Sequence, residues 1–367
     1  MEVPFVDLKM QYDSISSEVN RAITNVISET AFIGGKHVKL FEDNFSKKYG
    51  VKNCISCGNG TDALYITMKM LGIGPGDEVI TVANSWISSS ETISQTGAKP
   101  IFVDCDSHYY TIDEKLIESK ITKNTRAIIP VHLYGQMANM PEICKIAEDN
   151  NLFVIEDCAQ SHFSKLNNVN AGLFGDVGTF SFYPGKNLGA YGDAGAIISN
   201  NDDYSMRFRL YSKHGALKKH DHVMEGLNSR MDGIQAAILN VKLNYISDWT
   251  FQRRVNANVY FNALKDVREI VLPKVRDNST HSFHLFVIQA EKREELKSFL
   301  EEKNIETAIH YPKPLPTLEA YKKYNYDLDE FPVSTRLSSS ILSLPMYPEL
   351  QIEQIEYISE CIKEFYK

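Results

Sequence analysis

Long apolar segments are absent from this 367-residue chain. No run of about 18 apolar residues occurs, so the sequence predicts no membrane-spanning helix. The first residues lack the basic start and apolar stretch of a secretory signal, and we therefore expect a cytoplasmic protein. Basic residues are in the minority, with 39 Lys and Arg against 47 Asp and Glu and a net charge of −8. This balance argues against nucleic acid as a partner.

Cysteine is also scarce, with six in the chain. Cys54 and Cys57 form one C-x-x-C pair, but no second pair and no histidine pair at zinc-finger spacing accompany it. We therefore expect reduced thiols and no metal site. The proportions of apolar and charged residues, 43% and 23%, are those of a folded globular protein and exclude disorder or a long coiled coil.

Short β-rich segments alternate with helical patterns between residues 50 and 200. Two of the helices are expected at Asp62–Leu71 and Met140–Asn150. This alternation predicts an α/β fold with a mostly parallel sheet that is covered on both faces. Ligands in such sheets bind beyond the C-terminal ends of the strands. The expected strands are VITVA (79–83), PIFVD (100–104), AIIPV (127–131), LFVIED (152–157), TFSF (179–182) and GAIIS (195–199).

The last third of the chain predicts a second, smaller α/β domain. We place the large domain, with its N-terminal segment, at residues 1–245 and the small domain at residues 246–367. A Pro-rich loop, YPKPLP (311–316), interrupts the second part. The expected elements are a long helix at Arg230–Trp249, a strand at His284–Ala290, a helix at Arg293–Asn304, a strand at Glu306–His310 and a final helix at Gln351–Tyr366.

Two separated residues point to a particular cofactor. Lys186 lies in the glycine-rich segment GTFSFYPGKNLGAYGDAGA, and Asp157 lies at the end of an apolar strand in VIEDCAQSH. A lysine amine can form a Schiff base with the aldehyde of pyridoxal phosphate. An aspartate can pair with the protonated pyridine nitrogen and keep the ring an electron sink. The combination predicts a pyridoxal-phosphate site.

Further residues could hold the phosphate and the ring of this cofactor. The turn Gly58-Asn59-Gly60-Thr61 precedes a helix, whose N-terminus favours an anion, and Ser181 could complete the cup. Trp86 could stack on a flat heterocycle, and Gln160 could reach its phenolic oxygen. A plain glycine turn, a core tryptophan and a surface glutamine are the alternative interpretations of these residues.

The same turn allows a second interpretation. Gly58-x-Gly60-x-x-Ala63 also fits a dinucleotide-binding fingerprint, which would indicate a nicotinamide-dependent dehydrogenase. The acidic residue that should end the next strand is poorly placed, because Asp77 and Glu78 precede that strand. The fingerprint is therefore the weaker of the two interpretations.

The ordered motifs of the chain resemble the DegT/DnrJ/EryC1/StrS family of sugar-nucleotide aminotransferases. They include VPFVDL, FIGGKHVKLFEDNFSKKYG, GNGTDAL, PGDEVI, GAKPIFVDCD, HLYGQMANM, IEDCAQSH, FSFYPGKNLGAYGDAGAI, GLNSRMDGIQAAIL, HYPKPLP and SLPMYPEL, and they extend over nearly the whole chain. The resemblance implies the aspartate aminotransferase-like fold, fold type I of the pyridoxal-phosphate enzymes. It also implies a homodimer that shares its active sites.

The resemblance further implies roles for individual residues. Lys186 would be the catalytic lysine and Schiff-base residue. A neighbouring subunit would lend Asn228 to the cofactor phosphate. The other expected cofactor-binding residues are Gly60, Thr61, Trp86, Asp157, Gln160 and Ser181. The expected substrate-binding residues are Tyr183, Arg230, His310 and Tyr311.

The substrate expected from this resemblance is a 3-keto sugar nucleotide. Tyr183 stands where relatives that act at carbon 4 more often have histidine. The leading hypothesis is amination of a dTDP-linked 3-keto-6-deoxyhexose by glutamate, which gives a 3-amino-3,6-dideoxyhexose nucleotide for glycan biosynthesis. The alternatives are a UDP-linked 3-keto-hexuronic acid, a 4-keto sugar nucleotide, or a regulatory protein that keeps the fold. Pro316 and Glu319 depart from the family pattern, which usually has histidine and proline at these positions. The departure concerns how the substrate is recognised and leaves the expected cofactor chemistry unchanged.

Overall fold

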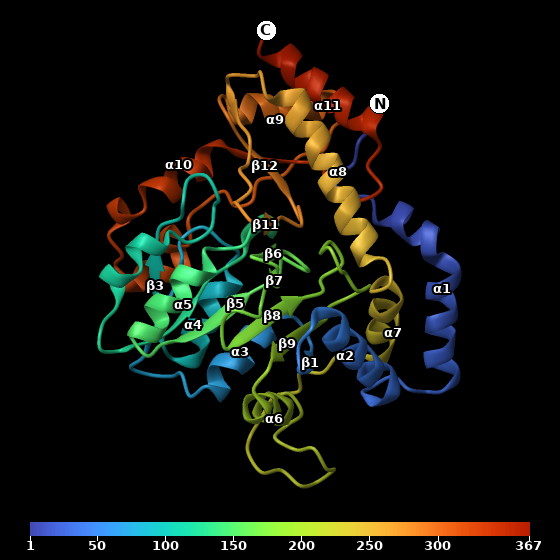
Figure 1. The fold of residues 1–367 in the computed structure, drawn as a ribbon, viewed down its shortest axis with the longest axis vertical. Coiled ribbons are helices and arrows are strands. Elements are labelled where there is room, and N and C mark those ends of the chain that lie inside the picture. Colours follow the sequence, from blue (N-terminus) through green and yellow to red (C-terminus); the bar gives the residue numbers. More distant parts are fainter.

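A seven-stranded sheet is the centre of the computed structural model, which describes residues 1–367 (Figure 1). From β8 to β3 every neighbouring pair of strands is parallel, and β9 alone runs antiparallel to its neighbours. The predicted mostly parallel sheet is therefore confirmed. The strand order is β1 (Asn53–Cys57), β9 (Gly195–Ser199), β8 (Val177–Ser181), β5 (Phe153–Asp157), β4 (Thr125–Ile129), β2 (Glu78–Val82) and β3 (Lys99–Val103).

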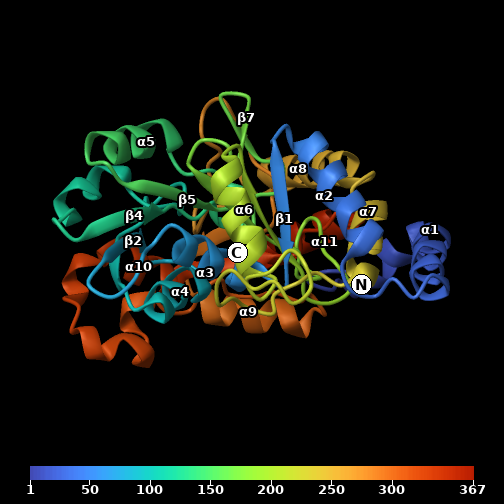
Figure 2. The same cartoon turned by 90° about the horizontal axis from the view of Figure 1, so that it is seen from below.

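Helices cover both faces of this sheet because successive strand side chains point to opposite sides. Ile80 and Ile128 belong to the apolar core that residues of α1, α2, α5 and α7 share, whereas Val79 and Ile129 belong to a separate core with residues of α3 and α4. Figure 2 shows α5 and α4 on opposite sides of β4 and β2. The helices are α1 (Leu8–Ser28), α2 (Gly35–Tyr49), α3 (Gly60–Met70), α4 (Ser88–Thr96), α5 (Met140–Asp149), α6 (Asp202–Tyr211) and α7 (Gly233–Lys242).

A second, three-stranded antiparallel sheet lies in the C-terminal part and has its own apolar core. Val3 joins this core, where its amide donates to the carbonyl of Asn304, so the N-terminus lies beside the C-terminal layer (Figure 1). Helix α8 begins at Ile246, where we expected the second domain to start. The elements are α8 (Ile246–Leu264), β10 (Ile270–Val271), β12 (Phe286–Ala290), α9 (Arg293–Glu302), β13 (Ile341–Leu344) and α11 (Ile352–Phe365).

Short elements connect the large sheet with the C-terminal part of the chain. Residues Leu315, Tyr321 and Phe331 pack back against Ala83 and Phe102 of the large sheet, although they lie within the second predicted domain. The remaining elements are η1 (Glu114–Leu116), η2 (Glu118–Lys120), η3 (Leu133–Gly135), β6 (Lys165–Leu166), β7 (Val169–Asn170), β11 (Ser279–Thr280), η4 (Leu315–Thr317), η5 (Glu319–Tyr324), η6 (Leu328–Glu330) and α10 (Pro332–Ser340). No helix combines the length and the apolarity that crossing a membrane requires.

Two predicted elements are wrong. The single helix expected at Arg230–Trp249 is two helices, α7 and α8, because α7 packs on α1 and α2 while α8 packs on α11. The strand expected at Glu306–His310 is reduced to an isolated bridge between Ala308 and Ser343. The carbonyl of His310 accepts from the Tyr134 hydroxyl, so this segment bonds to the loops around it and forms no ladder.

Candidate active site

The predicted site residues meet in one cavity of about 650 Å³ at the C-terminal ends of the strands. This volume lies within the usual range for small-molecule and cofactor sites. Asn228 and Arg230 are the two predicted residues that do not line it. Those that do are Gly60, Thr61, Trp86, Asp157, Gln160, Ser181, Tyr183, Lys186, His310 and Tyr311.

One end of the cavity is formed by the N-terminus of α3. The Asn59 side chain caps this helix by accepting from the Asp62 amide at 2.8 Å, which explains why α3 begins two residues before the predicted Asp62. A Cβ on Gly60 would lie 2.7 Å from Cβ of Ser181, so no side chain fits between α3 and β8. The unpaired amides of the first turn, with the hydroxyl groups of Thr61 and Ser181 beside them, favour an anion such as phosphate.

Asp157 supplies a buried carboxylate at the end of β5. Its oxygens accept from the Ser89 hydroxyl and the Ala159 amide, each at 3.1 Å. Burial raises the pKa of this carboxyl, while the two hydrogen bonds and the Lys186 ammonium act in the opposite direction. A second cation in the cavity would favour the ionised form further.

Lys186 extends into the cavity, and its amine makes no hydrogen bond or ion pair with the protein. Burial lowers the pKa of this amine to about 8, against the opposing pull of Asp157. Burial, together with the nearby Lys186 charge, lowers the pKa of His162 to about 3 and that of His310 to about 4. The histidines are therefore neutral at pH 7, and Lys186 is the most basic of these three groups.

Gln160 is held so that one donor remains free. Its Oε1 accepts from the Tyr134 amide at 2.7 Å, and its Nε2 donates to the Tyr311 hydroxyl at 3.1 Å. A primary amide has two N–H donors, so a second one stays available for a ligand. The side chain is thus positioned by contacts with η3 and with the Pro-rich loop.

Aromatic side chains form the mouth of the cavity. Trp86 and Tyr183 are 58% and 59% exposed, which is unusual for such large apolar groups. The rings of Trp86 and Tyr311 lie 5.8 Å apart between centroids. This arrangement leaves the indole face open for stacking on a flat ring.

Asn228 and Arg230 are exposed on the loop that follows α6, and Figure 1 shows this loop projecting away from the rest of the chain. Ser229, which lies between them, fastens the loop to the start of α3. Its hydroxyl accepts from the Gly58 amide at 3.0 Å and donates to Asp62 at 2.6 Å. Within one chain, both predicted residues therefore stay outside the cavity.

Several residues of the site escaped the sequence analysis. Ser89 holds Asp157, Tyr134 orients Gln160, and Ser229 anchors the loop. The run of serines after β2 is a signal that could have indicated Ser89. The sequence around Tyr134 carries no comparable signal, because its contact depends on a positive φ of 60° at that residue.

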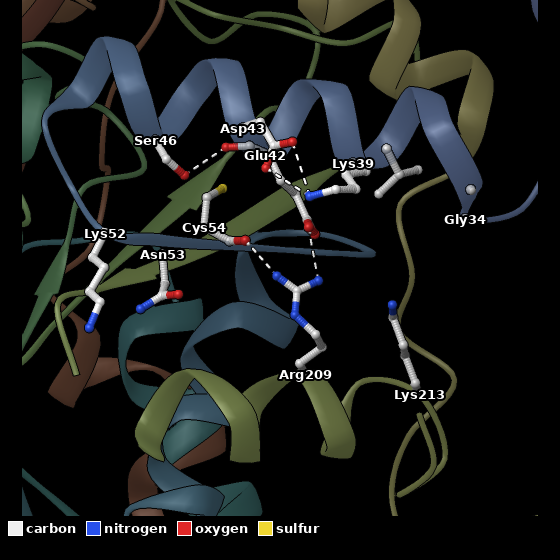
Figure 3. A pocket seen from close by; sticks show the side chains of 12 residues that line it. Gly34, Lys39, Glu42, Asp43, Ser46, Lys52, Asn53, Cys54, Arg209 and Lys213 are labelled. Atoms are coloured by element: carbon white, nitrogen blue, oxygen red, sulfur yellow. Dashed lines mark hydrogen bonds and ion pairs between the residues drawn. The ribbon is translucent and has the colours of Figure 1, made fainter. Parts of the chain in front are cut away.

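A second cavity, of about 400 Å³, lies between α2, β1 and α6 (Figure 3). Arg209 donates to Glu42 at 2.8 Å and to the Cys54 carbonyl at 2.9 Å, and Lys39 pairs with Asp43 at 3.1 Å. These four groups form two ion pairs. The lining also includes Lys52, which pairs with Asp202, and Lys213. We therefore assign no reaction chemistry to this cavity.

The dinucleotide-binding interpretation is wrong. Its fingerprint requires a strand, a helix and an adjacent parallel strand. Here β1 is at the sheet edge and pairs antiparallel with β9, and α3 leads to β2 near the opposite edge. The glycines instead allow α3 to approach Ser181 closely.

The residues of the large cavity fit pyridoxal phosphate. The α3 N-terminus suits the phosphate, Asp157 suits a protonated ring nitrogen, and the unpaired amine of Lys186 suits the aldehyde. Trp86 and Gln160 suit the ring face and the phenolic oxygen.

Comparison with known proteins gives matches over the whole chain. Residues 13–363 match the DegT/DnrJ/EryC1/StrS aminotransferase family. A protein named pleiotropic regulatory protein, from Geobacillus stearothermophilus, is 43% identical over 100% of this chain and 99% of its own. The dTDP-3-amino-3,6-dideoxy-alpha-D-galactopyranose transaminase of Aneurinibacillus thermoaerophilus is 41% identical, with 99% of each chain covered.

Solved structures agree with these matches. The structure of S. venezuelae DesV in complex with a ketimine intermediate has a TM-score of 0.98 at 35% identity and covers 100% of this chain and 99% of that chain. NtdA of Bacillus subtilis, with bound cofactor PMP, has a TM-score of 0.92 at 30% identity and covers 99% of this chain and 85% of that chain. Because the family match is nearly full-length and the cavity fits the cofactor, we conclude that this chain belongs to the DegT/DnrJ/EryC1/StrS aminotransferase family and is a pyridoxal-phosphate-dependent aminotransferase.

Proposed function

We propose that the enzyme transfers the amino group of glutamate to carbon 3 of a dTDP-linked 3-keto-6-deoxyhexose. The product would be a 3-amino-3,6-dideoxyhexose nucleotide for glycan biosynthesis. Support comes from the transaminase of Aneurinibacillus thermoaerophilus, whose name states a dTDP-3-amino-3,6-dideoxyhexose. The observation that carries the proposal is Tyr183, which lies beside Lys186 at the cavity mouth where carbon-4 relatives more often have histidine.

In this proposal, different lining residues bind different parts of the cofactor. Gly60, Thr61 and Ser181 bind the phosphate, and Asp157 faces the ring nitrogen. Trp86 stacks on the ring, and the free N–H of Gln160 reaches the phenolic oxygen. When bound, pyridoxal phosphate supplies an aldehyde that captures amines and a ring that withdraws electrons.

Lys186 has two roles in the proposed reaction. Its amine is the attachment point for the aldehyde, and an amine must be neutral to attack. The lowered pKa, about 8, makes a useful neutral fraction available near physiological pH. Once the donor displaces it, Nζ can take the proton from the α-carbon of glutamate and return one during transfer to the sugar.

The sugar nucleotide is proposed to bind at the open mouth. Tyr183 is exposed there, and Tyr311 and the neutral His310 line the wall next to it. Arg230 is the candidate for a donor carboxylate or a substrate phosphate. Because Arg230 lies outside the cavity of its own chain, we place it at the site of a partner subunit.

A homodimer with shared sites is part of this proposal, and the exposed loop supports it. Ser229 fixes the base of this loop next to α3, so Asn228 is presented outward where it can reach the cofactor phosphate of a second copy. Large apolar side chains are exposed around this region: Phe32 44%, Ile33 55%, Leu217 50% and Val223 65%. A cluster of this kind is typical of a surface that another chain covers.

A UDP-linked 3-keto-hexuronic acid is the second candidate substrate. The UDP-2-acetamido-2-deoxy-3-oxo-D-glucuronate aminotransferase of Pseudomonas aeruginosa is 38% identical to this chain. It shares the proposed carbon-3 chemistry but differs in nucleotide and sugar. A regulatory role is the further alternative, and the full set of cofactor-holding residues in the cavity argues against a protein without catalysis.

A comparison of three substrates tests the proposal. Purified enzyme and glutamate are incubated separately with dTDP-3-keto-6-deoxyglucose, its 4-keto isomer and a UDP-linked 3-keto-hexuronate. Displacement of the carbonyl by one ring position can slow the reaction on the order of 10²-fold, so kcat/KM for the 3-keto dTDP sugar should exceed that for the isomer by about this factor. Preferential amination of the 4-keto isomer or of the UDP sugar would overturn it.

Tyr183→His is the matched variant for this experiment. The side chain is exposed, so the fold should tolerate the change. If Tyr183 sets the choice of carbon, the ratio between the two dTDP isomers should shrink while the binding of dTDP itself stays constant. An unchanged ratio would remove Tyr183 as the discriminating residue.

A further inference from the structure

A buried lysine, Lys242, lies directly behind the loop that carries Lys186. It is at the last position of α7 and is 1% exposed. Its Nζ donates to the carbonyl of Gly189 at 2.7 Å. The amine also lies 4.7 Å from the ring centroid of Tyr191 and 6.0 Å from that of Trp249.

No carboxylate forms an ion pair with Lys242. Its pKa is lowered to about 8 by burial, and the more distant Glu349 carboxylate opposes this. A buried amine without a direct counter-ion is unfavourable, and replacing such a charge by an apolar side chain of similar volume is often neutral or stabilising. Packing alone therefore does not account for lysine at this position, whereas the contact with the Gly189 carbonyl does.

A second residue of α7 holds the same loop. The Oε1 of Gln235 accepts from the Tyr191 amide at 2.8 Å, and its Nε2 donates to the Tyr191 carbonyl at 3.4 Å. Both backbone groups of Tyr191 are thus bound by one side chain. Helix α7 contacts the loop at two points, Gly189 and Tyr191.

The internal contacts of the loop connect these points to Lys186. The amide of Ala190 donates to the Phe182 carbonyl at 2.7 Å, and the amide of Lys186 donates to the Tyr183 carbonyl at 2.8 Å. A Cβ on Gly189 would lie 2.2 Å from the Pro184 carbonyl oxygen, so the two halves of the loop are in close contact. A displacement of Gly189 would therefore move the backbone that carries Lys186.

We propose that Lys242 and Gln235 are positioning residues for transamination, which hold the Lys186 loop against α7 and thereby set where the Lys186 amine lies. The inference rests on the proposed role of Lys186 as the attachment point. Neither residue lines the cavity, so both act through the loop and touch neither cofactor nor substrate.

Lys242→Met and Gln235→Leu test this inference, with Asn240→Ala as the control. Asn240 is also on α7, but it accepts from Asn44 of α2 and does not contact the loop. Amide hydrogen exchange of peptides covering residues 183–192 is measured on cofactor-free protein, together with thermal unfolding. In Lys242→Met we expect at least roughly tenfold faster exchange in these peptides, because the Gly189 carbonyl loses its donor and the loop its contact with α7. The unfolding temperature separates this local loosening from a loss of overall stability.

Kinetics of the loaded enzyme give the second measurement. A misplaced amine should lower kcat on the order of 10²-fold in Lys242→Met while KM for the sugar nucleotide stays within about threefold. Gln235→Leu should show the same pattern more weakly, and Lys242→Arg, which keeps a donor, should recover much of the loss. Asn240→Ala should leave exchange in the loop and kcat unchanged.

Two results would overturn the inference. One is a folded Lys242→Met or Gln235→Leu variant whose loop exchange and kcat equal those of the wild type. The other is a loss of kcat that follows the loss of stability equally in all variants, including Asn240→Ala, which would indicate general packing. If Lys242→Met does not fold, loop exchange and kcat of Gln235→Leu alone decide whether the inference holds. Because exchange is measured without cofactor, its outcome is independent of whether Lys186 is the attachment point.

Discussion

In the proposed reaction, the ionisation of Lys186 is the single-residue property that most directly controls the chemistry. Burial lowers its pKa to about 8, and the nearby Asp157 carboxylate limits the decrease. The two residues come from different strands and loops, yet each influences the charge of the other. The pair therefore determines at which pH the amine can attack an aldehyde.

The rate at which pyridoxal phosphate attaches to cofactor-free protein should follow this ionisation. Since burial disfavours the ammonium form, the neutral amine predominates above about pH 8, not above the ordinary pKa of 10.5. The rate should rise about tenfold per pH unit below pH 8 and level off above it. Visible absorbance in a stopped-flow pH series measures this.

Two variants check the assignment. Lys186→Ala should show no attachment, and borohydride reduction with peptide mapping should label Lys186 alone in the wild type. Asp157→Asn removes the charge that raises the pKa of Lys186, so the rate should level off at a lower pH than in the wild type. A rate that keeps rising to about pH 10, the value for an ordinary lysine, would contradict the lowered pKa.

At the scale of elements, the close contact between α3 and β8 forms the anion-binding end of the cavity. The first turn of α3 can lie directly against β8 because Gly60 has no side chain. Ser181 occupies the space that a Cβ at Gly60 would need. The amide groups of the first turn are thereby directed into the cavity. Helix position, and not only residue type, thus creates the proposed phosphate site.

Gly60→Ala should separate α3 from β8. Its Cβ would lie 2.7 Å from Cβ of Ser181, a rigid part of the strand, so overpacking of about 1–3 kcal/mol is expected. Affinity for pyridoxal phosphate should fall at least roughly tenfold, because the first-turn amides move. Denaturant unfolding and cofactor titration measure the two effects.

Gly74→Ala is the matched control for this prediction. A Cβ at Gly74 would lie 3.7 Å from the Thr96 carbonyl oxygen, which is an ordinary contact. Stability and cofactor affinity should stay close to those of the wild type. Equal cofactor affinity in the Gly60 and Gly74 variants would show that the close approach is not needed for the phosphate.

At the scale of the whole molecule, the cavity of one chain lacks two of its predicted residues. Asn228 and Arg230 are on an exposed loop that is fastened beside α3 and projects outward. Two-fold symmetric dimers are the commonest soluble oligomers, and in the proposed dimer each copy would receive this loop and lend its own. The unit of activity in this proposal is thus the dimer.

Subunit mixing tests the shared site. Lys186→Ala and Asn228→Ala homodimers should each be impaired, because one lacks the amine and the other lacks the contact to phosphate. After mixing and exchange, each heterodimer should contain one intact site, so activity should recover. Recovery is measured by turnover, and heterodimers are quantified by mass spectrometry. Heterodimer formation without any recovery would argue against Asn228 acting across the interface.

How far the sequence predicts this protein depends on the range of the interactions. The strands expected between residues 79 and 199 are present. Asp157 and Lys186, expected in one cofactor site, line the same cavity, and their roles stay predictions. Their signals are local, since strand periodicity, a polar residue at a strand end and a glycine-rich loop each lie within a few residues. The family motifs added the roles, because they occur in a fixed order along the chain.

Long-range contacts were decided only by the tertiary structure. The break between α7 and α8, the loss of the strand at Glu306–His310 and the edge position of β1 depend on which elements pack together. Gln160 meets Tyr311 across 151 positions, and Lys242 meets Gly189 across 53. Such pairs leave no periodic pattern in the sequence, because a hydrogen bond between distant residues exists only once the topology brings them together. The sequence thus determined the chemistry that the site can support, and the packing of α3, α7 and the loops determined where each reactive group lies.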